Sequence, residues 1–230
     1  MCKALAIIPA RGGSKGINRK NLFSVNGCPL IYWTIKAAKE SKYISDIVVS
    51  SDDEEILEYS KRQGLISINR PSNLAKDESS MDSVISHSIN ELLSQAKEYD
   101  NFILLQPTSP LRDSEDINTA FEFFYRSNAK SLISVCKVNN KYLKSFYEDA
   151  NGFIKGIAND NFPFMRRQDL PHIYLSNGAI YISSIKEYFK FNSFMTAKTI
   201  KFEMPINKSV DIDSLKDIDI AEECFKNILK

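Results

Sequence analysis

Cysteine and histidine are both scarce in this sequence. Its 230 residues include four cysteines, Cys2, Cys28, Cys136 and Cys224, and two histidines, His87 and His172. The cysteines are far apart and form no CxxC pair, so we expect them to be reduced and structural rather than a disulfide framework. Two histidines are too few for a His-rich zinc site.

Long apolar runs and a strong net charge are also absent. No window approaches the ~20 apolar residues of a membrane span, and the N-terminus lacks the apolar stretch and cleavage site of a signal peptide. Lys and Arg total 30 and Asp and Glu total 29, which gives a formal net charge of +1. We therefore expect a cytoplasmic protein that binds neither nucleic acid nor membrane.

Apolar and amphipathic segments alternate through the first 138 residues. Apolar runs predict strands over Ala4–Ile8, Asp46–Ser51, Leu65–Ile68, Asn101–Gln106 and Ser131–Val138. Helical spacing predicts helices over Pro29–Ser41, Asp53–Gln63, Ser79–Lys97 and Ser114–Ser127. This alternation predicts an α/β fold, a doubly wound and mostly parallel sheet with helices on both faces. Ligands of such sheets bind at the carboxyl ends of the strands.

The alternation weakens in the second half of the chain. Residues 140–171 are rich in Asn, Lys and aromatic residues and contain the hairpin signal Asn151–Gly152, so we expect them to leave the core. Further strands are predicted over Gly178–Ser184 and Thr199–Met204, and a last helix from about Ser214 to Leu229. We interpret residues 1–230 as a single domain with one excursion.

A basic, glycine-rich loop follows the first predicted strand. The stretch IIPARGGSKGINRKN holds three glycines, two arginines and two lysines. Glycines let a backbone approach a ligand and expose its N–H groups, and Arg11, Lys15 and Lys20 add full charges. The loop matches neither GxxxxGK[ST] nor GxGxxG. A solvated loop with incidental charge is the alternative, but a position directly after a buried strand favours a triphosphate site.

Two carboxylates lie close together near the end of the chain. In an extended segment Asp211 and Asp213 project to the same face, where they repel each other unless a cation lies between them. Oxygen ligands suit Mg²⁺, which keeps several waters and shares substrate phosphates. The alternative is that Asp213 caps the helix that follows. Asp217 and Asp219 are expected to be surface charges.

Several blocks together resemble the N-acylneuraminate cytidylyltransferases, the CMP-sialic acid synthetases. In chain order they are ARGGSKGINRKN, LLQPTSPLR, RQDLP, NGAIYI and SVDIDSLKD, and they span nearly the whole chain. The resemblance implies a Rossmann-like nucleotidyltransferase fold. It also implies an enzyme that couples CTP to a nine-carbon 2-keto sugar acid, N-acetylneuraminate or a related nonulosonic acid such as legionaminate. A divalent cation, Mg²⁺, would be needed, and pyrophosphate would leave.

The resemblance also assigns the nucleotide side of the site. The implied nucleotide-binding residues are Arg11, Gly12, Ser14, Lys15, Lys20, Asn21, Arg70 and Ser79. Arg70 would read the edge of cytosine, since arginine can donate to its O2 and N3 acceptors, and Asn21 would reach the ribose. Helix capping is the alternative for Ser79. The implied catalytic residues are Arg11, Lys15, Lys20, Asp211 and Asp213, of which the two aspartates would hold the metal.

The implied sugar-side residues come from the later blocks and from the excursion. They are Gln106, Lys144, Arg167, Gln168, Asn177, Tyr181 and Phe194. Arg167 suits the carboxylate of the sugar acid because its planar guanidinium can donate two parallel hydrogen bonds to both carboxylate oxygens. For Phe194 the alternative is simple packing. Arg112 is either a site residue or an ion-pair partner. Leu175 replaces an arginine that many relatives have, so the exact sugar acid stays open.

The excursion at residues 140–171 resembles the arm through which members of this family form dimers, so we expect a homodimer whose arms reach the partner's site. A CMP-Kdo synthetase-type enzyme and a non-catalytic nucleotide-binding protein are the alternatives. Neither His87 nor His172 falls in a recognised block. We therefore expect the anomeric hydroxyl to attack the α-phosphate through positioning and charge stabilisation, without a histidine base.

Overall fold

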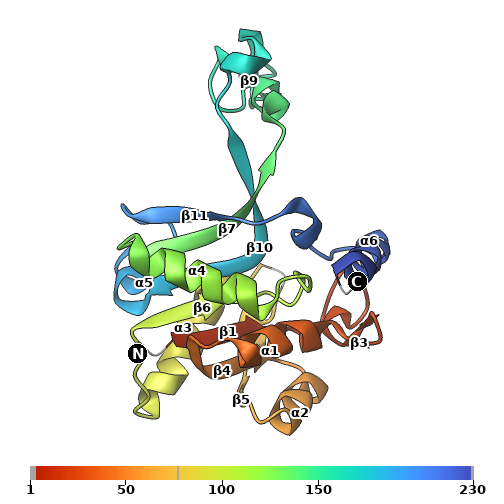
Figure 1. Cartoon of the computed structure of the whole chain (residues 1–230), viewed down its shortest axis with the longest axis vertical. Helices are drawn as coiled ribbons and strands as arrows, with labels where there is room; N and C mark the ends of the chain where they lie inside the picture. The colour runs from red at the N-terminus through yellow and green to blue at the C-terminus, as the bar shows by residue number, and fades with distance from the viewer. Residues whose placement is uncertain (1–3, 77, 229–230) are drawn as a thin grey trace.

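A seven-stranded sheet forms the body of the protein, which we describe from a computed structural model over residues 4–76 and 78–228 (Figure 1). The strands are β1 (Ala4–Pro9), β4 (Ile44–Ser51), β5 (Ile66–Asn69), β6 (Asn101–Leu104), β7 (Ser131–Val138), β10 (Ile173–Ser184) and β11 (Thr199–Glu203). Their order is β11-β7-β10-β6-β1-β4-β5. β10 runs antiparallel to both of its neighbours, and the other pairs are parallel. The predicted α/β fold with a mostly parallel sheet is confirmed.

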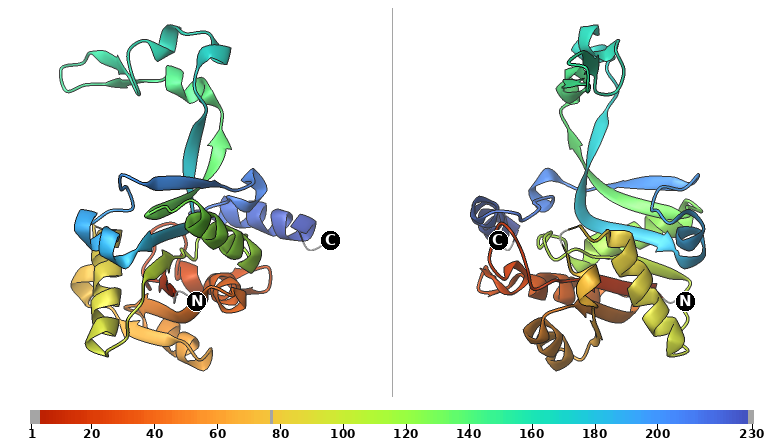
Figure 2. Two further views of the ribbon diagram at one scale, coloured as in Figure 1. Left: turned by 60° about the vertical axis from the view of Figure 1, so that its left-hand side comes forward. Right: turned by 180° about the vertical axis from the view of Figure 1, so that it is seen from behind.

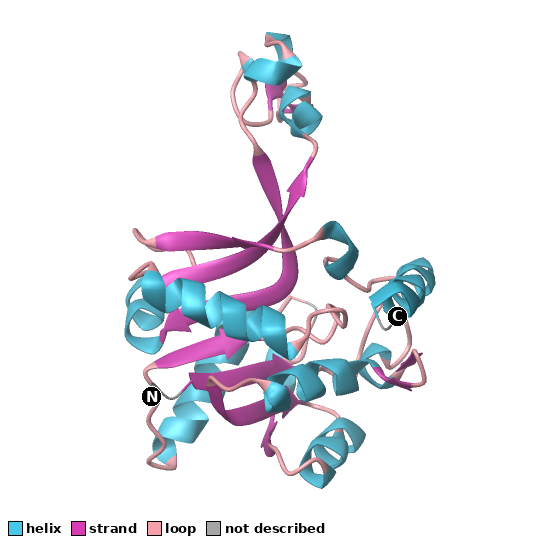
Figure 3. Ribbon diagram, viewed as in Figure 1, coloured by secondary structure: helices cyan, strands magenta, loops and turns pink. Residues whose placement is uncertain are grey.

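Helices cover both faces of this sheet, as Figure 3 shows. The cluster on one face includes side chains of α1 (Leu30–Glu40), α2 (Glu54–Arg62) and α4 (Ser114–Arg126). The cluster on the other face includes α3 (Met81–Ser94) and α5 (Ile185–Phe191). The last helix, α6 (Leu215–Ile228), packs instead beside the loops that follow β1 and β6. A short ribbon of β2 (Ser24–Val25) and β3 (Cys28–Pro29) precedes α1.

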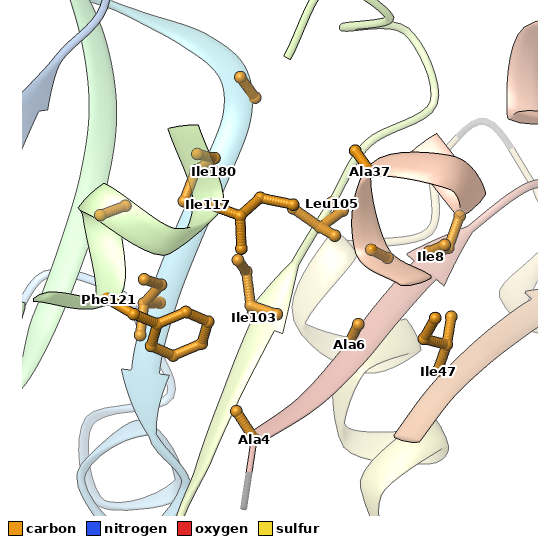
Figure 4. Close-up of a cluster of buried hydrophobic side chains, with 14 of the residues drawn as sticks. Ala4, Ala6, Ile8, Ala37, Ile47, Ile103, Leu105, Ile117, Phe121 and Ile180 are labelled. Carbon is orange, nitrogen blue, oxygen red and sulfur yellow. The ribbon is translucent and has the colours of Figure 1, made fainter. Parts of the chain in front are cut away.

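The central strand β1 is buried on both faces, which explains its continuous apolar sequence. Ala4, Ala6 and Ile8 point into the cluster beneath α1, α2 and α4, part of which is drawn in Figure 4. Leu5 and Ile7 belong to the opposite cluster beneath α3 and α5. Removal of these side chains from water on both faces is the main stabilising contribution to the body.

Local capping explains most of the helix boundaries. Asp53 precedes α2 and accepts hydrogen bonds from the N–H groups of Glu55 and Ile56, and Gly64 follows with a φ of +73°. Helix α3 is shorter than predicted, because Ser80 caps its start and Ala96, at a φ of 58°, turns the chain out of the helix.

The segment 140–171 stands away from the body as an arm on the ends of β7 and β10 (Figures 1 and 2). Within it, β8 (Phe146–Glu148) and β9 (Ile154–Gly156) form the expected antiparallel hairpin, and Gly152 supplies the turn with a φ of +82°. The arm exposes large apolar side chains, namely Tyr142, Phe146, Tyr147, Phe153, Ile154, Ile157 and Phe164. So many exposed apolar groups on a projecting element are typical of an interaction surface.

Two findings bear on the absences noted in the sequence. Cys28, Cys136 and Cys224 are free thiols, as expected, while Cys2 lies outside the described residues. Among the helices of the described chain, none has both the length and the apolar character that a membrane crossing requires.

Candidate active site

A cavity of about 300 Å³ lies at the carboxyl ends of β1, β5 and β6. It is lined by Pro9, Arg11, Gly13, Ser14, Lys20, Asn21, Arg70, Met81, Gln106, Pro107, Thr108, Asp211 and Asp213. This is the sheet edge where the parallel topology predicts a ligand. The cavity brings together eight of the predicted site residues: Arg11, Ser14, Lys20, Asn21, Arg70, Gln106, Asp211 and Asp213.

Hydrogen bonds within the protein shape the basic loop. The buried Asn21 donates from Nδ2 to the Arg11 carbonyl oxygen at 2.8 Å, which holds the two ends of the loop together. The Gly12 N–H donates to Asp52 Oδ1 at 3.0 Å. A Cβ on Gly12 would lie 2.8 Å from the Asp53 Cβ atom. In this structure Gly12 allows the close approach of the loop to the turn at Asp52 and Asp53, and its contact with a nucleotide stays a prediction.

The loop cations have different surroundings. Lys20 Nζ is 2.8 Å from Asp213 Oδ1 and donates to the Ile212 carbonyl oxygen at 2.9 Å. Arg19 turns away and pairs with Asp53 and Glu55 at 2.9 Å and 2.6 Å. Lys15 is exposed on the loop and is not among the residues that line the cavity. Lys20 thus connects the basic loop directly to the acidic segment.

Asp211 and Asp213 both line the cavity, as their spacing predicted. Ile212 between them is fully buried, and its N–H donates to the Thr108 carbonyl oxygen at 2.8 Å. This anchor keeps the segment extended, so that the two carboxylates share a face. Loss of water contact at the cavity wall raises the pKa of Asp211, and the charge of Asp213 adds to the rise, whereas the Thr108 hydroxyl and Lys20 oppose it.

The expected alternative role for Asp213, capping of the last helix, belongs to another residue. Asp217 Oδ2 accepts hydrogen bonds from Asp213 N at 3.1 Å, Ser214 N at 2.8 Å and Ser214 Oγ at 2.8 Å. Asp217 therefore closes the first turn of α6 and is not a mere surface charge, because its carboxylate satisfies N–H groups that the helix leaves without partners. The Asp213 carboxylate stays at the cavity.

Two glycines allow close contacts in the walls of the cavity. A Cβ on Gly16 would lie 2.1 Å from the Asp213 carbonyl oxygen, so the basic loop touches the acidic segment directly. Gly178 has a φ of +71°, and a Cβ there would lie 2.7 Å from Gln106 Oε1 and 3.8 Å from Asp211 Oδ1. It sits where the register between β10 and β7 shifts. The backbone contact of Gly16 and the positive φ of Gly178 both favour glycine.

Arg70 forms a buried part of the cavity wall. Its side chain donates from Nη2 to the Ser50 carbonyl oxygen at 2.6 Å and from Nε to Ser50 Oγ at 3.2 Å. Burial lowers the pKa of Arg70, and Asp52 opposes this effect. The fixed guanidinium suits recognition of a flat polar ligand. Ser79, by contrast, does not line the cavity and donates to the Asn73 carbonyl oxygen at 3.1 Å.

Three predicted sugar-side residues are engaged inside the body instead of lining the cavity. Asn177 is buried, accepts from Ser134 Oγ at 2.6 Å and donates to Ser209 Oγ at 2.9 Å. The Tyr181 hydroxyl lies 2.6 Å from Ser176 Oγ, and its ring packs 5.2 Å from that of Phe194. In this structure Asn177 and Phe194 position and pack β10, and their sugar contact stays a prediction.

The remaining predicted sugar-side residues, Lys144, Arg167 and Gln168, belong to the arm. None of them lines the cavity of its own chain, and the arm points away from the body (Figure 2). Within one chain these residues and the cavity are separate.

The chemistry of the cavity fits a magnesium ion shared with a substrate. Within residues 4–76 and 78–228, no three His, Cys, Asp or Glu side chains converge as a metal cluster. Asp211 and Asp213 present two carboxylates on one face, and Mg²⁺ commonly uses one or two carboxylates with waters and substrate phosphates. These two residues would hold it.

Thr108 and Lys208 were not predicted from the sequence to take part in the site. Thr108 follows β6 within the LLQPTSPLR block, so its position at a strand end was a usable signal. Lys208 had none, because its partners lie far away in the chain. Its Nζ is 2.6 Å from Asp113 Oδ2 and 2.8 Å from Asp116 Oδ2, at the start of α4. It anchors the segment that leads into Asp211.

We expect Lys208→Met to lower the free energy of unfolding by about 1–3 kcal/mol at pH 7, because it leaves two partly buried carboxylates without their ion-pair partner. Burial alone would raise the pKa of Asp113, but the Lys208 hydrogen bond holds it below its ordinary value. Burial raises the pKa of Asp116 despite the same partner. Burial would lower the pKa of Lys208, but the hydrogen bonds that it donates to both carboxylates raise it above its ordinary value.

The sign of the pH dependence follows from these shifts. The depressed pKa of Asp113 contributes stability that is lost as the pH falls through it, and the raised pKa of Lys208 contributes stability that is lost at alkaline pH. In urea unfolding, the difference in the free energy of unfolding between wild type and Lys208→Met should be largest between about pH 5 and pH 10 and should become smaller below about pH 4. The exposed pair of Lys201 with Glu203 provides the control Lys201→Met, which should change little. If the difference in the free energy of unfolding stayed constant down to acid pH, the ion pairs of Lys208 with Asp113 and Asp116 would not be its cause.

Comparison with known proteins agrees with this geometry. A sequence profile of the family described as cytidylyltransferase matches residues 5–226. The chain is 33% identical over 225 residues, 97% of both proteins, to the pseudaminic acid cytidylyltransferase of Campylobacter jejuni subsp. jejuni serotype O:2. It is 34% identical over 218 residues to the N-acylneuraminate cytidylyltransferase of Streptococcus agalactiae serotype V, which covers 94% of this chain and 51% of that protein.

The fold also matches a solved structure, a CMP:2-keto-3-deoxy-manno-octonic acid synthetase complexed with CTP. The TM-score is 0.69 at 14% identity, over 98% of this chain and 99% of that chain. The predicted Rossmann-like nucleotidyltransferase fold is thereby confirmed.

Proposed function

The chain belongs to the cytidylyltransferase family, and from that premise we propose that it transfers CMP from CTP to a nonulosonic acid and releases pyrophosphate. The observation that carries the proposal is the cavity itself. It joins a glycine-rich basic loop to two carboxylates, and the direct contact between Lys20 and Asp213 spans 193 positions of the chain. A cavity with cations on one side and a paired acidic face on the other suits a triphosphate with a divalent cation.

In this proposal some residues of the cavity bind the nucleotide, and others stabilise the negative charge of its phosphates. Arg11 and Lys20 face the phosphates, and Arg70, fixed by Ser50, reads the base. The anomeric hydroxyl of the acceptor attacks the α-phosphorus, the bond to the bridging oxygen breaks, and pyrophosphate leaves with the electron pair. When bound, Mg²⁺ held by Asp211 and Asp213 would neutralise negative charge on the phosphates.

Proton removal from the attacking hydroxyl does not require a histidine. Neither His87 nor His172 is among the residues that line the cavity. Phosphoryl-type transfer depends mainly on positioning and electrostatic stabilisation. The proton of the hydroxyl passes to water, and the cations of the loop stabilise the charge that develops on pyrophosphate.

We propose a sialic-type acid, N-acetylneuraminate or legionaminate, as the acceptor. The two named relatives are named for different nonulosonic acids, and the chain is similarly identical to both, 33% and 34%. They therefore support a nonulosonic acid as the acceptor more strongly than they support one particular acid. Leu175, which is 61% exposed on β10, replaces the arginine of many relatives and leaves an apolar group there.

A homodimer is the second part of the proposal. The arm exposes Phe153 at 68% and Phe164 at 83%, and burial of such side chains against a second copy removes them from water. Closed two-fold dimers are the most common assembly of soluble oligomers. In this arrangement the arm of one chain carries Arg167 and Gln168 to the cavity of the partner.

Pyrophosphate release tests the proposed function directly. Purified protein with Mg²⁺ should release pyrophosphate from CTP, and far less from ATP or GTP, when N-acetylneuraminate, legionaminic acid or pseudaminic acid is supplied. Kdo, a shorter acid, should react at least about tenfold more slowly, roughly the 1.4 kcal/mol that a tenfold change in rate represents. Binding of CTP without turnover on any of these acids would instead indicate a non-catalytic nucleotide-binding protein. A preference for Kdo would indicate the CMP-Kdo synthetase type.

A further inference from the structure

Arg112 is a buried cation without an acidic partner. Its side chain is 2% exposed, and it does not line the cavity. The nearby carboxylates Asp113 and Asp116 pair with Lys208. The guanidinium bonds only to neutral oxygens, and Nη1 has no hydrogen-bond partner among the described residues. Neither alternative from the sequence, site residue or ion-pair partner, describes it.

Such an arrangement costs stability. Burial lowers the pKa of Arg112 to about 10, although the charges of Asp116 and Asp113 oppose the shift, so the group stays charged at neutral pH in a water-excluded place. A buried charge without a direct ion pair is unfavourable compared with an apolar side chain of similar volume. Features that cost stability in an otherwise regular core are expected at functional sites.

The three acceptors of Arg112 explain what the charge does. Nε donates to the Ala179 carbonyl oxygen at 3.0 Å. Nη2 donates to Thr34 Oγ1 at 2.8 Å and to the Gln106 carbonyl oxygen at 3.2 Å. One guanidinium therefore joins helix α1, the end of β6 and the irregular part of β10. Its planar, branched donor set suits three acceptors that lie in different directions.

Two of these acceptors lie on either side of the close approach between Gly178 and Gln106 in the cavity wall. Gln106 lines the cavity, and Ala179 follows Gly178, whose backbone approaches the Gln106 side chain and Asp211. We propose that Arg112 is a positioning residue for CMP transfer, because it fixes the backbone on both sides of this contact and so holds the Gln106 side chain beside Gly178 at the cavity. The inference rests on the proposed function, since transfer is its readout.

A second, mainly apolar cavity provides a means to test this role. It has a volume of about 150 Å³, and its walls include Trp33, Leu111, Phe225 and Arg112 itself. Truncation of Arg112 would extend this space, so a small cation such as guanidinium or ethylguanidinium could enter and replace the missing group.

The experiment compares Arg112→Ala, Arg112→Lys and Thr34→Val with wild type. We expect Arg112→Lys to lower kcat about 100-fold with the KM for CTP changed less than about threefold, because an ammonium group keeps the charge but cannot reach all three oxygens. Thr34→Val, which removes one acceptor at nearly constant volume, should lower kcat about threefold to tenfold. Ethylguanidinium should raise kcat of Arg112→Ala at least about tenfold. Arg126→Ala, an exposed arginine on α4, is the matched control and should match wild type.

Melting temperature and circular dichroism separate positioning from folding. Wild-type kcat in a folded Arg112→Lys protein, or rescue of the melting temperature without rescue of kcat, would overturn the proposal. If Arg112→Ala does not fold, the proposal is tested with Thr34→Val and Arg112→Lys. Unchanged kcat in both of these variants would also overturn the proposal. Absence of pyrophosphate release by the wild type would contradict the proposed function instead, so the two failures are distinguishable.

Discussion

Asp211→Asn is expected to lower the rate of CMP transfer by about 10²–10³-fold, about 3–4 kcal/mol of transition-state stabilisation, while the protein stays folded. The substitution keeps size and hydrogen-bonding ability but removes one of the two negative charges that face the cavity. The Asp211 side chain lies on an extended segment that Ile212 anchors, so the backbone should not move. Asparagine is a weaker ligand for Mg²⁺ than a carboxylate, and the loss should appear mainly in kcat at saturating CTP.

A control and a second readout make this prediction specific. Asp219 is exposed on α6 and away from the cavity, and Asp219→Asn should keep wild-type activity. A chelator should remove wild-type activity, and added Mg²⁺ should restore it. Calorimetry should show that Mg²⁺ strengthens CTP binding to wild type more than to Asp211→Asn. Full turnover of Asp211→Asn, or of wild type in excess chelator, would refute the metal assignment.

Two inactive variants, Arg167→Ala and Asp211→Asn, are expected to recover about a quarter of wild-type activity when mixed in equal amounts. Arg167 belongs to the arm and Asp211 to the body, and within one chain they do not meet. If subunits exchange freely in a two-fold dimer, half of the dimers are mixed, and one of the two sites in each then has both residues intact. Steady-state pyrophosphate release after mixing measures the recovery.

The arm also offers a matched control for this experiment. Lys155 lies in β9 and pairs with Asp149, so Lys155→Ala should be active on its own. Sedimentation should show a dimer for all variants. A monomer, or a mixture that remained inactive although labelled subunits were seen to exchange, would show that Arg167 does not act across the interface.

The sheet was predictable from the sequence because its strands are buried on both faces. Strands β1 and β6 have continuous apolar sequences, and helix α1 matches its predicted range within one residue at each end. The first half of β10 and helix α5 were not predictable. Residues Ile173–Ser176 are partly or fully exposed and pair only with β7 in the neck of the arm. Helix α5 has seven residues, of which only Tyr188 is buried, so neither segment shows a clear periodic pattern.

The parts of the candidate site that were predictable are those whose residues lie close together in the sequence. The loop from Arg11 to Asn21 and the spacing of Asp211 and Asp213 carry their chemistry within a few residues. Contacts that cross the fold leave no such trace. No local pattern shows that Gly16 touches Asp213 or that Arg112 holds Ala179. Nor does a local pattern show that the Asn177 amide ties β10 to Ser134 and Ser209.

Strand β10 belongs both to the arm and to the central sheet. It runs as one strand from Ile173, at the neck of the arm, to Ser184 beside β6, and Gly178 beside the cavity lies between these ends. The arm is therefore not a detachable module, since a shift along or across this strand displaces the arm and the cavity wall together. A ligand that alters the wall must also alter the energy of the arm's position, and by thermodynamic reciprocity the converse holds. In the proposed dimer, communication between subunits would then need no separate structural element, because the backbone of a single strand connects the arm to the cavity wall.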